Sequence, residues 1–224
     1  MTMPSLSRVT RRRFLQAAGY TATAVALRAE NILGANDTIR LGLIGCGGRG
    51  TGLAKQFAGV KGAKIVALSD ADTTHMEKLA GTLSQKHPTL KPDLHQDYRR
   101  LLERQDVDAV IIASPNHWHA LQTIHACQAG KDVYVEKPVS HDIWEGHQMA
   151  AAAKQHQRIV QAGTQNRSDI GLIKAFDFIQ KGELGAIKAV RGLCYRNRAS
   201  IGKSETPISP PETVDYNLWL GPAQ

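Results

Sequence analysis

A glycine-rich stretch near the start of the chain has the residue types and spacing to cradle a phosphate group. Gly45-Cys46-Gly47-Gly48-Arg49-Gly50 fits the pattern G-x-G-x-x-G. In such a loop the first glycine makes a tight turn, the second lets the backbone approach a pyrophosphate, and the third lets the next helix pack close to the sheet. The N–H groups that begin the helix then face the phosphates. The candidate cofactor-binding residues here are Gly45, Gly47, Gly48, Arg49 and Gly50, although Arg49 fits a solvated loop position equally well.

Asp70 supports the same interpretation, because it lies twenty residues beyond Gly50 at the end of the next apolar run. A carboxylate at this distance accepts hydrogen bonds from an adenosine ribose and repels a 2′-phosphate. The cofactor is therefore expected to be NAD rather than NADP. The alternative is that Asp70 serves as a helix N-cap beside Thr73.

The elements that must position these residues follow an alternating pattern. Short β-branched runs alternate with helical stretches, which predicts an α/β fold with a doubly wound parallel sheet of the Rossmann type. The expected strands cover residues 39–45, 63–70, 108–114, 132–137 and 158–164, and the expected helices 49–57, 74–85, 98–104, 117–129, 142–156 and 170–180. Met76, Leu79 and Leu83 form one apolar stripe on the second helix. A further strand is expected over residues 186–197, followed by an irregular segment.

The first 35 residues have the features of an export signal. A basic region precedes a modest apolar run and small residues, and Thr10 to Gln16 resembles a twin-arginine signal because paired arginines precede Phe-Leu. Cleavage after Ala26 and cleavage near Ala35 both fit, and a disordered basic arm is the alternative. The signal predicts export by the twin-arginine machinery to the bacterial periplasm.

Composition excludes several other classes of protein. The leader holds five arginines and one acid, so it supplies about half of the net charge of +8, and a nucleic-acid-binding surface is not expected. The apolar run at residues 17–27 is too short to span a bilayer, so no stable membrane span is expected. The three cysteines, Cys46, Cys127 and Cys194, lack a C-x-x-C spacing and are expected to be buried thiols.

No metal site is expected either. His117 and His119 lie two residues apart on an expected helix, so they point to different faces and cannot chelate one ion together with His125. Trp118, between them, is expected in core or interdomain packing.

Several further motifs together resemble one enzyme family. These are "ASPNHWHA" (113–120), "VEKPVS" (135–140), "AGTQNRS" (162–168) and "DYNLWLGPAQ" (215–224), in addition to the glycine loop and "LSDAD" (68–72). The chain from about residue 38 onward resembles the glucose-fructose oxidoreductase / inositol dehydrogenase / rhizopine-catabolism (Gfo/Idh/MocA) family. Glu136-Lys137-Pro138 is the most specific part of the resemblance, and the leader resembles that of the family's exported bacterial branch.

The resemblance implies a role for each matching residue. Pro115, Asn116 and His119 would lie along the cofactor, and Glu136 and Lys137 near the nicotinamide. Pro138 would shape the turn that aims Lys137. Gln165 and Arg167 would stand at the mouth between two domains, as candidates on the substrate side.

Lys137 is the predicted catalytic residue for a chemical reason as well. Removal of hydride from a carbinol carbon needs a group that takes the hydroxyl proton, and a positioned lysine can act as that general base.

The resemblance also implies a Rossmann domain at 36–164 and, at 165–224, the start of a second α/β domain. The remaining catalytic groups of the family, a histidine with a nearby aspartate, lie beyond the segment that matches this chain, so the second domain is expected to be truncated. A homo-oligomer is expected for a full-length chain.

Three functions remain open from the sequence. The first is an exported oxidoreductase with tightly bound NAD that acts on a hydroxyl of a sugar, cyclitol or related polyol. The second is an NAD-dependent glycosidase that works by redox elimination. The third is a fragment that binds NAD and is catalytically incomplete.

Overall fold

The computed structural model describes residues 38–195, 197–200, 202, 203, 205, 206 and 208–223. A six-stranded sheet forms its centre, with the strand order β3-β2-β1-β4-β5-β6. All five strand pairs are parallel. The order changes direction beside β1, between β2 and β4, as in the Rossmann dinucleotide-binding fold. The predicted doubly wound α/β fold is confirmed.

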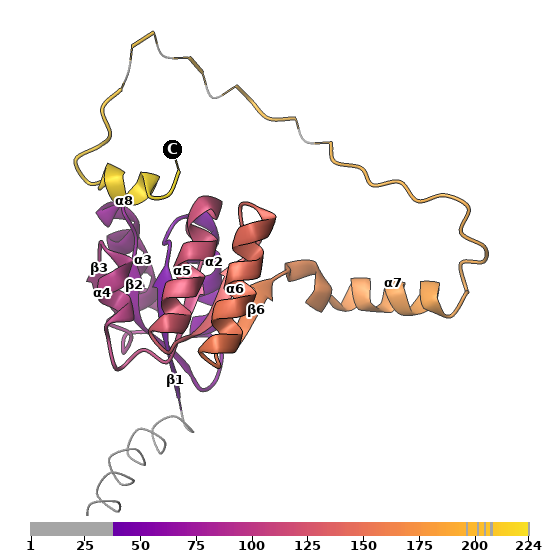
Figure 1. Ribbon diagram of the computed structural model, residues 1–224, viewed down its shortest axis with the longest axis horizontal. Helices are drawn as coiled ribbons and strands as arrows, with labels where there is room; N and C mark the ends of the chain where they lie inside the picture. Colours follow the sequence, from indigo (N-terminus) through magenta and orange to yellow (C-terminus); the bar gives the residue numbers. More distant parts are fainter. Residues whose placement is uncertain (1–37, 196, 201, 204, 207, 224) are drawn as a thin grey trace, which may run out of the picture.

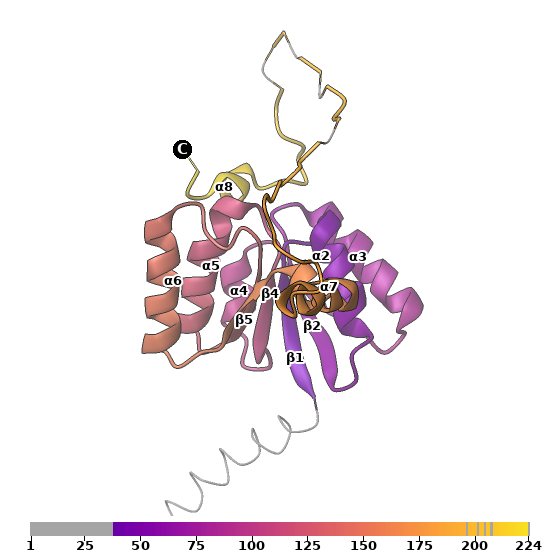
Figure 2. The same ribbon diagram turned by 90° about the vertical axis from the view of Figure 1, so that its right-hand side faces the viewer.

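Helices cover both faces of this sheet. The strands are β1 (Ile39–Ile44), β2 (Ala63–Ser69), β3 (Asp93–His95), β4 (Ala109–Ile112), β5 (Asp132–Glu136) and β6 (Val160–Gly163). One face is covered by α2 (Gly48–Ala58) and α3 (Thr73–Lys86), the other by α4 (Tyr98–Leu102), α5 (Asn116–Gln128) and α6 (Ile143–Gln155) (Figure 2). A 3₁₀ helix (Gln165–Ser168), α7 (Ile170–Gln180) and α8 (Tyr216–Leu220) follow β6.

The strands are apolar on both sides because two separate cores flank the sheet. Leu43 packs in the core under α2 and α3, while its neighbour Ile44 belongs to the core under α4, α5 and α6. This is why the strands read as continuous apolar runs rather than as alternating ones. The predicted stripe of Met76, Leu79 and Leu83 is buried on α3.

Most of the helices begin at an aspartate whose side chain accepts a hydrogen bond from a backbone N–H of the first turn. These N-cap residues satisfy donors that the helix itself leaves free. They are Asp72, Asp97, Asp142, Asp169 and Asp215.

The structure differs from the sequence-based prediction at two places. Strand β3 is not predicted from the sequence, because only one of its three residues is apolar and none is β-branched, and only its pairing with β2 identifies it. The strand expected over 186–197 is wrong: the described residues of this range form no strand and are exposed. No described strand lies beside them to supply the hydrogen bonds that an extended segment needs.

The chain leaves the sheet after β6 and then returns to it. None of the residues of α7 is buried, and α7 and the segment after it extend away from the sheet (Figure 1). The chain then comes back so that α8 lies at the carboxyl end of the strands (Figures 1 and 2). Residues more than 100 positions apart are thereby brought together at this edge.

Three further expectations concern the ends of the chain and the cysteines. The expected export signal at residues 1–35 lies outside the described residues. Among the residues that are described, none of the helices combines the length and hydropathy needed to cross a bilayer. Cys46 and Cys127 are buried as expected, but Cys194 is exposed, because it falls in the segment that forms no strand.

Candidate active site

The glycine loop lies where β1 ends and α2 begins, and its glycines are required by close packing. Gly45 has a φ of +92°, and a Cβ there would lie 2.4 Å from the Ser114 backbone nitrogen. A Cβ on Gly50 would lie 1.8 Å from the Gly45 carbonyl oxygen. Gly47 and Gly48, in contrast, have no atom within 4 Å of such a position. The loop is therefore tight toward the sheet and open on its outer side, as a cradle for a pyrophosphate must be.

The start of α2 is also free to receive an anion. Gly47 is the N-cap residue and offers no side-chain hydrogen bond, and the first turn holds no acidic residue. The first N–H groups of a helix carry a partial positive charge. Together with the open outer side of the loop, they fit the phosphates of a dinucleotide.

Asp70 stands at the end of β2 with its carboxylate fixed beside this loop. Its Oδ2 accepts from the Cys46 backbone N–H at 2.6 Å, and its Oδ1 accepts from the Asp72 N–H at 2.9 Å. His75 lies 3.5 Å from Oδ1. The N-cap residue of α3 is Asp72, not Asp70. The capping role considered for Asp70 is therefore filled by another residue.

Cys46, inside the loop, has no chemical role in this geometry. Burial, reinforced by the nearby Asp70 carboxylate, raises the pKa of the Cys46 thiol. The side chain stays a neutral thiol that donates to the Ser69 carbonyl oxygen and packs in the core under α2 and α3.

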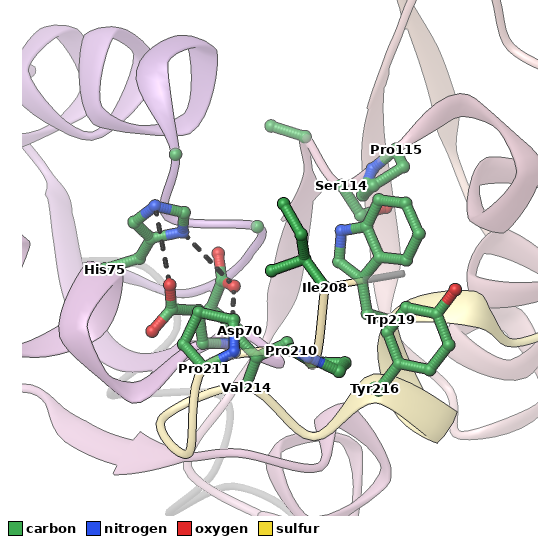
Figure 3. Close-up of a pocket in the computed structure, with 14 residues that line it drawn as sticks. Asp70, His75, Ser114, Pro115, Ile208, Pro210, Pro211, Val214, Tyr216 and Trp219 are labelled. Carbon is green, nitrogen blue, oxygen red and sulfur yellow. Dashed lines mark hydrogen bonds and ion pairs between the residues drawn. The ribbon is translucent and has the colours of Figure 1, made fainter. Parts of the chain in front are cut away.

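A pocket of about 530 Å³ opens between this loop and the returning end of the chain (Figure 3). Four of the predicted cofactor residues line it: Gly45, Gly47, Asp70 and Pro115. The returning end of the chain supplies a further part of the wall, from residues that the sequence did not mark as functional, namely Ile208, Pro210, Pro211, Val214, Tyr216 and Trp219. The volume suits a nucleoside-sized ligand.

Arg49, in the glycine loop, pairs with Glu136 at the end of β5. Its Nε and Nη2 donate to Glu136 Oε1 at 2.8 and 2.5 Å. The Glu136 side chain is only 4% exposed. Hydrogen bonding to Glu136 raises the pKa of Arg49 above its ordinary value. The guanidinium is held by Glu136 rather than free in solvent, because a buried carboxylate needs a cationic partner. A phosphate contact of Arg49 stays a prediction.

Gln165 completes this cluster. In the orientation in which its side-chain oxygen faces Arg49, the amide accepts from Nη2 at 2.7 Å. The cluster thus joins the loop after β1, the end of β5 and the segment after β6.

Lys137 follows Glu136 directly and is exposed. The peptide bond between Lys137 and Pro138 is cis. Lys137 lines a hollow of about 220 Å³ together with Gln165 and Arg167. The structure therefore brings the predicted catalytic residue and the two predicted substrate-side residues to one place.

His119 and Asn116 do not line the large pocket, unlike Pro115. The His119 ring is buried between two loops, with Nδ1 2.6 Å from the Pro138 carbonyl oxygen and Nε2 2.8 Å from that of Ser114. His119 thus links the loop after β4 to the loop that carries Lys137 and acts as a positioning residue. His117 points elsewhere, as expected, toward the Trp219 carbonyl oxygen at 3.0 Å.

Comparison with known proteins finds a matching family and similar chains. A model of the Gfo/Idh/MocA oxidoreductase family with an NAD-binding Rossmann fold matches residues 39–164. A glycosyl hydrolase family 109 protein from Shewanella sp. strain ANA-3 is 34% identical over 171 residues, which cover 66% of this chain and 38% of that protein.

Two solved structures are similar as well. The myo-inositol 2-dehydrogenase of Lactobacillus plantarum aligns with a TM-score of 0.61 and 28% identity, over 67% of this chain and 43% of its own. The scyllo-inositol dehydrogenase of Lactobacillus casei, with bound NAD(H) and scyllo-inositol, aligns with a TM-score of 0.60 and 27% identity, over 66% of this chain and 42% of its own. The chain thus spans less than half the length of these relatives.

Proposed function

The chain belongs to the Gfo/Idh/MocA family of NAD-binding oxidoreductases, and we propose that it binds NAD for hydride transfer at a carbinol carbon of a sugar, cyclitol or related polyol. One observation carries this proposal. The nucleoside-sized pocket beside Gly45, Gly47 and Asp70 lies on the same sheet edge as the hollow that Lys137 lines. A dinucleotide that crosses the glycine loop extends over both sides of β1 at this edge.

The residues present fit such a cofactor. The open side of Gly47 and Gly48 and the free start of α2 would hold the pyrophosphate, and the Asp70 carboxylate would accept from the adenosine ribose. The negative charge of Asp70 would repel a 2′-phosphate, so we propose a preference for NAD over NADP. When bound, the nicotinamide ring accepts hydride from the substrate or returns it.

Lys137 would carry out the proton transfer. Its exposed amine lies beside Gln165 and Arg167, which offer an amide and a guanidinium to the hydroxyl groups of a polyol. In oxidation, Lys137 would take the proton of the reacting hydroxyl while the C–H bond breaks, and it would return that proton in reduction. His119 holds the turn that presents Lys137.

The test is calorimetry on the chain after removal of any carried-over nucleotide. NAD should bind clearly more tightly than NADP, and a panel of cyclitols and sugars should then be screened for formation of reduced cofactor. Absence of a heat signal with both coenzymes would refute the proposal. Binding of NAD without activity on any polyol would instead favour the third candidate, an NAD-binding fragment that is catalytically incomplete.

A glycosidase is the second candidate, because the chain resembles a glycosyl hydrolase family 109 protein at 34% identity. In this reaction, transient oxidation at one sugar carbon would acidify the neighbouring C–H bond, and loss of that proton would expel the glycosidic oxygen. Addition of water and return of the hydride would complete a net hydrolysis. Cleavage of a glycoside without accumulation of reduced cofactor would identify this activity.

We also propose export of the folded, cofactor-loaded protein by the twin-arginine route. The support is the sequence from Thr10 to Gln16. Fractionation of cells that express the chain should place it in the periplasm. Replacement of Arg11 and Arg12 by lysine should retain it in the cytoplasm, and an unchanged distribution would contradict this route.

A further inference from the structure

We propose that residues 208–219, here called the roof segment, close over the adenosine half of the cofactor site and slow the release of the nucleotide. This inference rests on the proposed binding of NAD. It assigns a binding role to a part of the chain that lies outside the Rossmann sheet and outside the region matched by the family model.

The roof segment is fastened to the loop that carries Asp70. The Thr73 backbone N–H donates to the Thr213 carbonyl oxygen at 3.1 Å, and the Asp215 N–H donates to the Ala71 carbonyl oxygen at 2.9 Å. Between these bonds, Asp72 and Val214 form an antiparallel bridge. The roof segment is therefore paired with the loop that follows β2, directly beside the carboxylate proposed to bind the ribose.

A second attachment holds its other end on α5. The indole Nε1 of Trp118 donates to the Leu218 carbonyl oxygen at 2.9 Å. Gly221 packs against the same indole, so that a Cβ at Gly221 would lie 2.0 Å from the ring. The two attachments lie on opposite sides of the pocket, and the roof segment spans it.

The side of the roof segment that faces the pocket is apolar and partly aromatic. Ile208, Pro210, Pro211 and Val214 form part of the wall, and the rings of Tyr216 and Trp219 stack on each other with centroids 5.9 Å apart and an interplanar angle of 16°. Figure 3 shows Pro211 and Val214 beside Asp70, and Tyr216 and Trp219 across the pocket from it. Flat apolar and aromatic walls suit a nucleobase, which binds by stacking and burial of its faces.

The position of the roof segment relative to the sheet places it over the adenosine half of the cofactor rather than over the nicotinamide half. Strands β2 and β5 lie on opposite sides of β1 in the sheet. The roof segment bonds to the loop after β2, whereas Lys137 follows β5. A dinucleotide with its adenosine ribose at Asp70 thus has its adenine under the roof segment and its nicotinamide toward Lys137.

Gly221→Ala tests whether the roof segment slows nucleotide release, and it changes no residue that lines the pocket. The added methyl group collides with the buried Trp118 ring and should detach the roof segment. The NAD dissociation rate should rise about tenfold or more, the size expected when a stacked base loses its aromatic partner. Gly202→Ala is the matched control, because Gly202 also has a positive φ (+84°) but no neighbour within 4 Å of an added Cβ.

A second pair of variants changes the pocket wall itself. Trp219→Ala removes an aromatic side chain that is 44% exposed, and Tyr195→Ala removes one that is 88% exposed and outside the pocket. Calorimetry with ADP-ribose and with nicotinamide mononucleotide should separate the two halves of the cofactor. Trp219→Ala should weaken ADP-ribose about tenfold and leave nicotinamide mononucleotide unchanged, while Tyr195→Ala should change neither affinity. Thermal unfolding of each variant checks that the sheet domain remains folded.

The outcomes separate this inference from the proposed function. Suppose that the unmodified chain binds NAD, and that Gly221→Ala and Trp219→Ala bind and release NAD and ADP-ribose at the same rates and affinities. The proposed role of the roof segment is then refuted, while the proposed function stands. If the unmodified chain binds neither coenzyme, both are refuted. Equal weakening of ADP-ribose and nicotinamide mononucleotide would also overturn the assignment to the adenosine half.

Discussion

Arg49 and Glu136 form an ion pair that joins the glycine loop to the end of β5, across 87 positions of sequence. Glu136 is almost fully enclosed and depends on this guanidinium, because a buried carboxylate without a partner is strongly unfavourable. Lys137 is the next residue. The pair therefore fixes the cofactor loop and the predicted catalytic residue relative to each other.

Loss of Arg49 should destabilise the fold more than loss of an exposed arginine. Arg49→Ala leaves the Glu136 carboxylate buried without its partner, and we expect a loss of about 1–3 kcal/mol in the free energy of unfolding. Urea unfolding measures this change. The double variant Arg49→Ala/Glu136→Gln should recover part of the loss because the buried charge is gone. Arg100→Ala, in an exposed pair with Glu103, should change stability little, and an equal effect of both single variants would contradict the importance of the buried pair.

Asp70 should control the choice between the two coenzymes. Asp70→Asn keeps a side-chain oxygen that can accept from the Cys46 N–H but removes the charge that repels a 2′-phosphate. Affinity for NAD should fall about tenfold, as expected for a charge-assisted hydrogen bond, while affinity for NADP should fall less or rise. Calorimetry with both coenzymes gives the ratio directly. An unchanged ratio would mean that the Asp70 carboxylate does not contact the ribose.

The sheet and the glycine loop could be predicted because their signals are local. Apolar runs with covered faces mark the strands, and the positions of Gly45 and Gly50 are those at which a Cβ would meet backbone atoms. Asp70 follows from a fixed distance along the chain. The glycine pattern and the position of Asp70 lie within one βαβ unit, so their spacing in sequence was enough to predict them, although the backbone that a Cβ on Gly45 would meet belongs to the loop after β4.

The partners of these residues could not be predicted in the same way. The pairing of Arg49 with Glu136 depends on the relative placement of β1 and β5, which are not adjacent in the sheet. The roof segment looked irregular, although Asp215 before an apolar aromatic run is an N-cap signal that indicates α8. Its place over the pocket follows from contacts with residues about 100 or more positions earlier, and no local pattern encodes these contacts.

Lys137 should be needed for catalysis but not for folding or cofactor binding. Its side chain is exposed, so Lys137→Met should leave thermal unfolding and NAD affinity nearly unchanged. Polyol-dependent reduction of NAD should fall by about 10²-fold or more, the contribution usual for a general base. The two measurements are calorimetry with NAD and the absorbance of reduced cofactor. Unimpaired turnover in Lys137→Met would remove this residue from the proposed mechanism.

Stability should decrease as the solution becomes mildly acidic, partly through His125 on α5. Its Nδ1 shares a hydrogen bond with the Tyr98 hydroxyl at 2.8 Å. Burial, together with the charge of Arg99, lowers the pKa of His125 below its ordinary value of about 6.5. Burial and the nearby Arg104 also lower the pKa of His95. The unfolded chain therefore binds protons more readily than the folded chain, so this contribution to stability is present above about pH 6.5 and is lost as the pH falls through the folded pKa.

His125→Gln should make this dependence shallower, because glutamine offers an acceptor to Tyr98 but does not titrate. Urea unfolding at a series of pH values between about 7.5 and 5 would measure the slope for both proteins. Since the Tyr98 ring also packs edge-on against Trp118, with centroids 5.4 Å apart, acid should loosen the Trp118 anchor of the roof segment and raise the NAD dissociation rate. A His125→Gln variant with the same slope as the unmodified chain would place the acid sensitivity elsewhere, with His95→Gln as the next variant to measure.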